Sequence, residues 1–104
     1  MVVVGGDYKN PDRRERVAAY SHDAGRTWRL TTQSPAGYRS AVAWLDDHTI
    51  ATVGPSGEEI STDGGVHWKP NTSFNLNALA ALNLHDAWAV GASGTIGRFS
   101  IEKR

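Results

Sequence analysis

The chain has 104 residues, with 11 Lys/Arg balanced by 11 Asp/Glu, so its formal net charge at pH 7 is zero. A neutral chain offers no overall field for nucleic acid or an anionic membrane, and we expect neither as a partner. Cysteine is absent, which excludes a disulfide framework and thiol chemistry. No stretch is long enough to span a membrane and no signal peptide is recognisable, so cytoplasmic and periplasmic or secreted locations both stay open.

Short apolar runs between turn residues predict strands throughout the chain. The first unit, about residues 1–33, opens with an apolar run at Val2–Gly5. Two further runs follow, at Val17–Tyr20 and Thr27–Leu30. Between the first and second runs lies a long polar stretch, which predicts a long loop.

The second unit, about residues 38–70, contains four predicted strands: Arg39–Leu45, Thr49–Gly54, Glu58–Thr62 and His67–Lys69. The third unit, about residues 75–104, contains three: Asn77–Leu82, Ala87–Val90 and Thr95–Ile101. If the four strands of the second unit are lettered A to D, the chain reads BCD–ABCD–ABC. No segment calls for a helix.

An internal repeat supports this division into units. Ser40–Gly57 aligns without gaps on Asn77–Gly94 at an offset of 37, with eight of 18 positions identical. So many matches in so short a window predict that the two segments fold alike. A structural repeat of this kind builds a stack or ring rather than one self-contained core.

Two copies of one motif punctuate the chain, SHDAGRTW at Ser21–Trp28 and STDGGVHW at Ser61–Trp68. Both read Ser-x-Asp-x-Gly-x-x-Trp, and their serines are 40 residues apart. An Asp side chain accepts hydrogen bonds from backbone N–H groups about two residues further on, glycine supplies a positive φ, and Trp packs on the hairpin. We therefore assign a structural role, neither catalytic nor metal-binding, to Ser21, Asp23, Gly25, Trp28, Ser61, Asp63, Gly65 and Trp68.

This motif resembles the Asp box, and the chain resembles the Asp-box (BNR-like) β-propellers. The resemblance implies an all-β propeller segment of about two and a half four-stranded antiparallel blades. Propellers close with about 4–8 blades, because a ring of sheets must hide its edges. We therefore expect either further blades of a longer chain or self-association to complete the ring.

Within that class the chain looks closest to the photosystem II stability/assembly factor-like family and its bacterial relatives. The resemblance rests on DAWAVGASGTIGRF (Asp86–Phe99) together with the run Val53–Trp68. It implies an assembly or scaffold protein that holds a protein partner, without a cofactor and without chemistry of its own.

In such a propeller the Asp-box turns lie at one end, and the B–C and D–A loops lie at the other, where ligands bind. The first B–C loop is long and carries both arginine and tyrosine, which are over-represented in binding hot spots. We predict a partner-binding surface built from Tyr8, Arg13, Arg14, Arg16, Tyr38 and Arg39. The alternative is a solvated loop whose charges neutralise one another, since Asp12 and Glu15 lie among the arginines.

The alternative function is part of a glycoside hydrolase or sialidase-like propeller enzyme whose catalytic residues lie largely outside this chain, because those families also use Asp-box propellers. Such hydrolysis needs two carboxylates across a cleft. Only Glu58 and Glu59 begin a strand at the expected mouth, and we recognise no catalytic constellation. A purely structural repeat segment is the third possibility. We expect no metal site, because the four histidines occupy variable box positions and A–B turns on different units.

Overall fold

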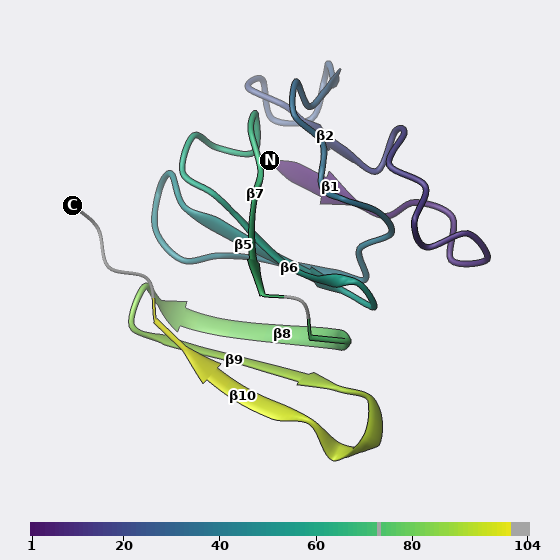
Figure 1. Cartoon of the computed structure of the whole chain (residues 1–104). Helices are drawn as coiled ribbons and strands as arrows, with labels where there is room; N and C mark the ends of the chain where they lie inside the picture. The colour runs from purple at the N-terminus through teal and green to yellow at the C-terminus, as the bar shows by residue number, and fades with distance from the viewer. Residues whose placement is uncertain (73, 101–104) are drawn as a thin grey trace.

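The computed structural model describes residues 1–72 and 74–100. Within these residues ten strands form three antiparallel sheets that follow one another along the chain (Figure 1). The helical content of the same residues is one turn of 3-10 helix, η1 (Ala92–Gly94), and no helix there is long and apolar enough to cross a membrane. The prediction of an all-β fold is confirmed.

Each strand pairs with the next one in the chain. Sheet 1 contains β1 (Val2–Val4), β2 (Ala18–Tyr20) and β3 (Arg29–Leu30). Sheet 2 contains β4 (Ala41–Trp44), β5 (Ile50–Gly54), β6 (Gly57–Ser61) and β7 (Lys69–Thr72). Sheet 3 contains β8 (Leu76–Asn83), β9 (Asp86–Gly91) and β10 (Ile96–Phe99). The three-four-three division follows the predicted BCD–ABCD–ABC pattern, although the predicted end of the last strand, Ile101, lies outside the described residues.

The strands that follow the two motifs begin two residues later than predicted. The backbone N–H groups of Thr27 and His67 are bonded to the aspartates of their motifs, at 2.8 and 3.0 Å. A backbone N–H that is already committed to a turn is not available to a sheet ladder. The ladders of β3 and β7 therefore start at Arg29 and Lys69.

The internal repeat is visible in the strand register. All four residue pairs between β4 and β5, from Ala41 with Val53 to Trp44 with Ile50, recur between β8 and β9 at an offset of 37. A close backbone approach recurs as well. A Cβ on Gly54 would lie 2.3 Å from the carbonyl oxygen of Tyr38, and a Cβ on Gly91 would lie 2.0 Å from that of Asn75. The equivalence of sheets 2 and 3 thus extends back to these D–A loops.

The repeat slips by one residue at the hairpin after the second strand. Gly54 pairs with Gly57 around a two-residue loop. In sheet 3 the N–H of Gly91 instead bonds to the carbonyl oxygen of Thr95 at 2.9 Å, so the loop has one more residue. Beyond this turn Gly97, which pairs with Ala89, is the counterpart of Glu59, which pairs with Thr52.

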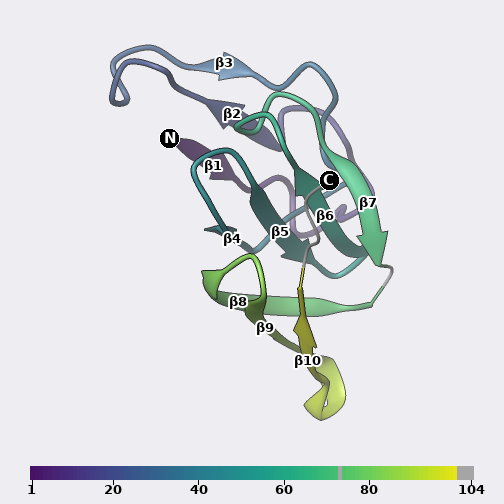
Figure 2. The same ribbon diagram turned by 90° about the vertical axis from the view of Figure 1, so that its left-hand side faces the viewer.

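The three sheets are stacked face to face with sheet 2 in the middle (Figures 1 and 2). Its β5 is buried along its whole length. On one side Val53 packs with Leu76 and Ala89 of sheet 3. On the other side sheet 1 approaches so closely that a Cβ on Gly65 would lie 2.7 Å from Val2 Cγ2.

The two outer faces of the stack are uncovered in the described part of the chain. On sheet 3, Trp88 and Val90 are 50% and 44% exposed, whereas their counterparts in sheet 2, Ala51 and Val53, are both 0% exposed. On sheet 1, Val3 is 49% exposed. The outer face of sheet 3 is therefore equivalent to the face of sheet 2 that sheet 3 itself covers.

Candidate functional site

The first Asp box is a turn closed by its own side chains. The Ser21 hydroxyl donates to Asp23 Oδ1 at 2.8 Å and accepts from the N–H groups of Asp23 and Gly25 at 3.3 and 2.9 Å. Asp23 Oδ1 also accepts from the N–H of Thr27 at 2.8 Å, and its Oδ2 accepts from the Thr27 hydroxyl. The Trp28 indole N–H donates to the Gly25 carbonyl oxygen at 3.0 Å. Every one of these contacts is local.

The second Asp box repeats this set of contacts. Ser61 donates to Asp63 at 2.9 Å and accepts from the N–H of Gly65 at 2.9 Å. Trp68 donates to the Gly65 carbonyl oxygen at 3.0 Å. The ring nitrogen Nδ1 of His67 lies 2.6 Å from Asp63 Oδ2, where the first box has the Thr27 hydroxyl.

The turn mechanism differs from the sequence expectation in one respect. We expected the aspartate to accept from N–H groups about two residues further on. The structure gives that role to the serine hydroxyl, while Asp23 and Asp63 reach the N–H four residues on. Positive φ at Gly25 (88°) and Gly65 (97°) is as expected.

The two motif tryptophans differ in burial. Trp68 is 1% exposed and Trp28 is 41% exposed. Trp68 lies at the junction of sheets 1 and 2, where its backbone N–H donates to the Gln33 carbonyl oxygen at 3.2 Å. The motif sequence alone does not predict this difference, because the burial of each tryptophan depends on whether another sheet packs against its hairpin.

The motif carboxylates are held in their charged form. Hydrogen bonds from the Thr27 hydroxyl and N–H, followed by that from Ser21, lower the pKa of Asp23 from 3.8 to about 2. Burial opposes the shift at Asp63, but hydrogen bonds from His67 and Ser61 still lower the pKa of that carboxyl below its ordinary value. Acceptors whose pKa is lowered in this way suit a structural turn better than proton transfer near neutral pH.

The long loop between β1 and β2 is folded back on itself. Its tip is closed by bonds from the N–H of Asn10 to the Asp7 carbonyl oxygen and from the N–H of Arg13 to that of Asn10, both 3.0 Å. The loop is also pinned to the D–A loop, because the N–H of Tyr38 donates to the Pro11 carbonyl oxygen at 2.9 Å.

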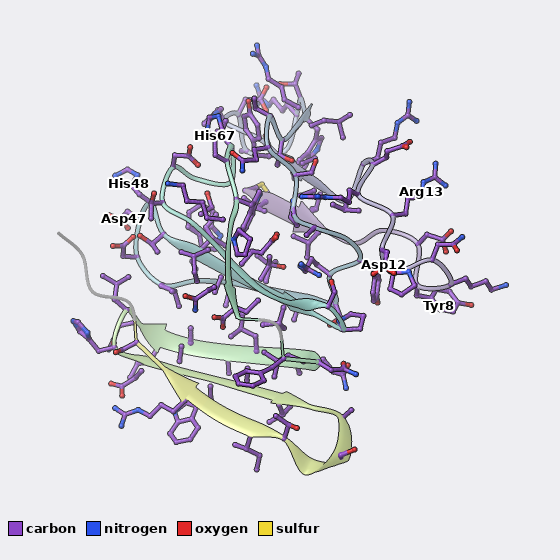
Figure 3. The ribbon with its side chains drawn as sticks, viewed as in Figure 1. Tyr8, Asp12, Arg13, Asp47, His48 and His67 are labelled. Carbon is purple, nitrogen blue, oxygen red and sulfur yellow. The ribbon has the colours of Figure 1, made fainter. Side chains whose placement is uncertain are left out.

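The pinned loops lie at the end of the molecule opposite the Asp boxes. Figure 3 shows Tyr8, Asp12 and Arg13 at one end, and Asp47, His48 and His67 at the other. A bond of 3.0 Å from the N–H of Gly64 to the His48 carbonyl oxygen joins the A–B turn to the Asp-box turn.

Five of the six predicted partner-binding residues reach the surface. Tyr8 is 70% exposed, Arg13, Arg14 and Arg16 are exposed, and Tyr38 is half-buried. Arg13 forms an ion pair with Glu15 at 3.6 Å that is itself exposed.

Arg39 is the exception, because only 2% of it is exposed. Its Nη1 donates to the Tyr38 carbonyl oxygen and to the Ser56 hydroxyl, both at 2.9 Å, and its Nη2 lies 3.7 Å from Glu59 Oε1. Arg39 is thus a buried group between sheets 1 and 2 and is not presented at the surface. Its partners were not predicted. The internal repeat did contain a signal that Arg39 is buried, because the third unit has the apolar Leu76 at the equivalent position.

The two carboxylates considered for catalysis lie on opposite faces of β6. Glu59 is turned toward sheet 1, where both its oxygens accept from the N–H of Ala36 at 3.0 and 3.1 Å. Glu58 is on the other face and accepts from the Asn71 amide. Burial raises the pKa of both carboxyls, although Arg39 opposes the shift at Glu59 and Asn71 opposes it at Glu58. They do not form a pair across one cleft.

No metal centre is formed by the residues that the structure describes. Over 1–72 and 74–100, no group of three or more His, Cys, Asp or Glu side chains is placed to hold an ion. His48 and His85 lie in equivalent turns of sheets 2 and 3, where Asp46 and Asn83 each accept from two following N–H groups.

Comparison with known proteins identifies the first motif. The BNR/Asp-box repeat family matches residues 19–30, which run from β2 through the first box to β3. No curated protein and no solved structure matches the chain significantly. The first turn is therefore an Asp-box repeat by sequence, and the serine, aspartate and tryptophan of the second form equivalent hydrogen bonds.

Proposed function

We propose that the chain is a segment of an Asp-box β-propeller of the photosystem II stability/assembly factor-like type that holds a protein partner without performing chemistry. The observation that carries the binding role is the pinned pair of loops opposite the Asp boxes. The bond from Tyr38 to Pro11 joins the two loops into one surface.

The blade arrangement is supported by the order of the sheets. The three sheets occur in chain order, and each covers an equivalent face of the one before it. Sheet 1 starts with a B strand and sheet 3 ends with a C strand in the described chain, so the strands form about two and a half blades. Further blades or other copies would then complete the ring.

The binding surface combines exposed aromatic and cationic groups on an ordered loop. Tyr8, Arg13, Arg14 and Arg16 are exposed, and Tyr38 adjoins them. A loop already folded by its own turns loses less conformational entropy on binding than a free one. Tyrosine and arginine are the residues that most often dominate binding energy.

Catalysis has less support in the geometry. Hydrolysis of the sialidase or glycosidase type needs two carboxylates on one cleft. Glu58 and Glu59 point to opposite faces of β6 and are 1% and 3% exposed. The scaffold role therefore accounts for more of the observations.

Affinity capture from an extract of the source cells tests the proposal. The variant Tyr8→Ala/Arg13→Ala/Arg14→Ala/Arg16→Ala should reduce retention of the partner at least about tenfold, because truncating a hot-spot residue costs about 2 kcal/mol or more. Arg26→Ala/Arg29→Ala, which removes exposed arginines at the other end, is the matched control and should retain it. Equal retention by both variants, or hydrolysis of aryl glycosides by the assembled protein, would contradict the proposal.

A further inference from the structure

A cavity of about 220 Å³ lies between sheets 2 and 3. Its walls come from β6, β8, β9 and β10, which lie in adjacent layers in Figure 1. Apolar or small residues make up much of the wall, among them Phe74, Leu76, Ala89 and Gly97. Glu58 contributes the carboxylate.

Glu58 is buried, and no residue that the structure describes serves as its counter-ion. It is 1% exposed, and its Oε1 accepts from the Asn71 amide. No ion pair involves this carboxylate in residues 1–72 and 74–100. Arg98 also lines the cavity, but its guanidinium donates to Asp86 Oδ1 at 2.6 Å and lies 5.9 Å from the ring centroid of Trp88. A buried carboxylate normally acquires a cationic partner, because an unpaired charge is costly in an apolar environment.

The equivalent place between sheets 1 and 2 contains a guanidinium. Arg39 occupies the position in sheet 2 that Leu76 occupies in sheet 3, and it is 2% exposed with Glu59 as its counter-ion. Glu59 in turn is the counterpart of Gly97. The third unit therefore lacks both members of the buried ion pair, and the residues at the equivalent positions, Leu76 and Gly97, line the cavity.

At the interface between sheets 2 and 3, the buried carboxylate belongs to sheet 2, the facing sheet, and not to sheet 3. Glu58 faces sheet 3, and the residue of sheet 1 at the matching register, Ala18 opposite Val4, has no charge. Space is available beside Gly97, because a Cβ there would have no atom within 4 Å. The interface between sheets 2 and 3 thus has the cavity and the carboxylate, but no guanidinium of the described residues is paired with Glu58.

We propose that this cavity binds the guanidinium of an arginine side chain presented by a partner polypeptide, with Glu58 as its counter-ion. Carboxylate and guanidinium form strong charge-assisted bonds, and Asn71 fixes one carboxylate oxygen. The aliphatic stem of the arginine packs on Leu76 and Phe74. Only the polypeptide source of the arginine depends on the proposed scaffold role.

Titration with N-acetyl-arginine methylamide, followed by NMR shifts of the Gly97 and Ala89 amides, tests the cavity. The citrulline analogue, which has the same shape without the charge, should bind at least about tenfold more weakly. Glu58→Gln keeps the shape of the side chain and should reduce the affinity for the arginine probe by a similar factor. Equal affinity for the two probes, or an unchanged affinity in Glu58→Gln, would overturn the proposal.

A second variant tests whether loss of folding, and not loss of the site, explains reduced binding of the probe. Gly97→Leu fills the cavity from a position that is free of clashes. It should abolish probe binding while its thermal unfolding matches that of the wild-type chain, and full binding by this variant would place the site elsewhere. A peptide with one internal arginine should bind at least as well as the small probe. If only the small probe binds, a polypeptide source is excluded.

The loop variant used above separates the two proposals. Tyr8→Ala/Arg13→Ala/Arg14→Ala/Arg16→Ala leaves the cavity intact and should bind the arginine probe with wild-type affinity. Loss of probe binding in that variant would contradict the cavity site. Failure of the loop to capture a partner would leave the probe result unchanged.

Discussion

At the residue scale, the Asp box is held by polar side chains more than by packing. Asp23 is exposed, yet its carboxylate receives bonds from Ser21 and from both the N–H and the hydroxyl of Thr27. Each donor prefers the ionised carboxylate, so together they lower its pKa to about 2. The turn therefore carries its own electrostatic stabilisation, whatever packs around it.

This stabilisation of the turn depends on pH with a defined sign. The folded pKa of Asp23, about 2, lies below its ordinary value of 3.8. The contribution is therefore complete above pH 3.8 and is lost as the pH falls through about 2. Thr27→Val removes the hydroxyl, the largest cause of the shift, and should raise the pKa of Asp23 toward 3.8 in a carboxyl ¹³C NMR titration. Thr62→Val, in the other box, is the control. An unshifted Asp23 in the Thr27 variant would refute the assigned cause.

At the element scale, the strands and their register could be predicted because the information is local or repeated. Alternating apolar residues located the strands, and the offset of 37 between Ser40–Gly57 and Asn77–Gly94 anticipated the shared register of sheets 2 and 3. The slip at the hairpin could not be predicted. Gly91 bonds to Thr95 although both turns contain the same Ser-Gly pair, and strand pairing decides which loop length forms.

The candidate sites likewise differ in whether they depend on local contacts or on contacts between distant parts of the chain. The box residues could be predicted because their bonds span four residues or fewer. The burial of Arg39 could not be, because it arises from contacts with Ser56 and Glu59, far along the chain. The cavity at Glu58 could not be predicted either, because it exists only where two sheets meet and depends on how they pack.

The residue before the box glycine gives a prediction about the hairpin turns. Ala24 has φ 61°, a strained conformation for a residue with a Cβ, and the second box has Gly64 there with φ 74°. Ala24→Gly should therefore stabilise the fold by about 0.5–1 kcal/mol, and Gly64→Ala should destabilise it by about 1 kcal/mol. A Cβ on Gly64 would have no atom within 4 Å, so the effect is conformational and not steric. Urea unfolding measures both variants, and a change of the same sign in both would contradict this account.

At the scale of the whole molecule, the two outer faces of the three-sheet stack are uncovered, although the equivalent faces inside the stack are covered. Sheet 2 has sheet 1 on one face and sheet 3 on the other. Sheets 1 and 3 leave apolar side chains exposed on their outer faces, including Val3 and Trp88. Large exposed apolar patches on proteins often mark interaction sites. We propose another sheet of the same design as the occupant, because the outer face of sheet 3 is equivalent to the face of sheet 2 that sheet 3 covers.

A pair of equivalent valines tests whether that outer face is covered in solution. Val53 is 0% exposed and Val90 is 44% exposed, although they occupy the same position in sheets 2 and 3. Val53→Ala should cost about 2 kcal/mol, from lost transfer energy and a residual cavity. In an isolated chain Val90→Ala should change the free energy of unfolding by less than about 0.5 kcal/mol. If chains stack, the cost at Val90 should approach that at Val53 and grow with protein concentration.

Light scattering after gel filtration measures the association directly. We expect a mass above the 11.3 kDa of one chain, because two uncovered apolar faces and unpaired strand edges favour pairing with other copies. Trp88→Glu places a charge at the centre of the outer face of sheet 3 and should shift the mass toward one chain, whereas Thr62→Glu, at the Asp-box end, should not. A discrete multimer that Trp88→Glu dissociates would mean that copies cover one another as sheet 3 covers sheet 2. A cooperatively folded monomer would instead show that the open faces are stable alone, and the argument for a ring would fail with it.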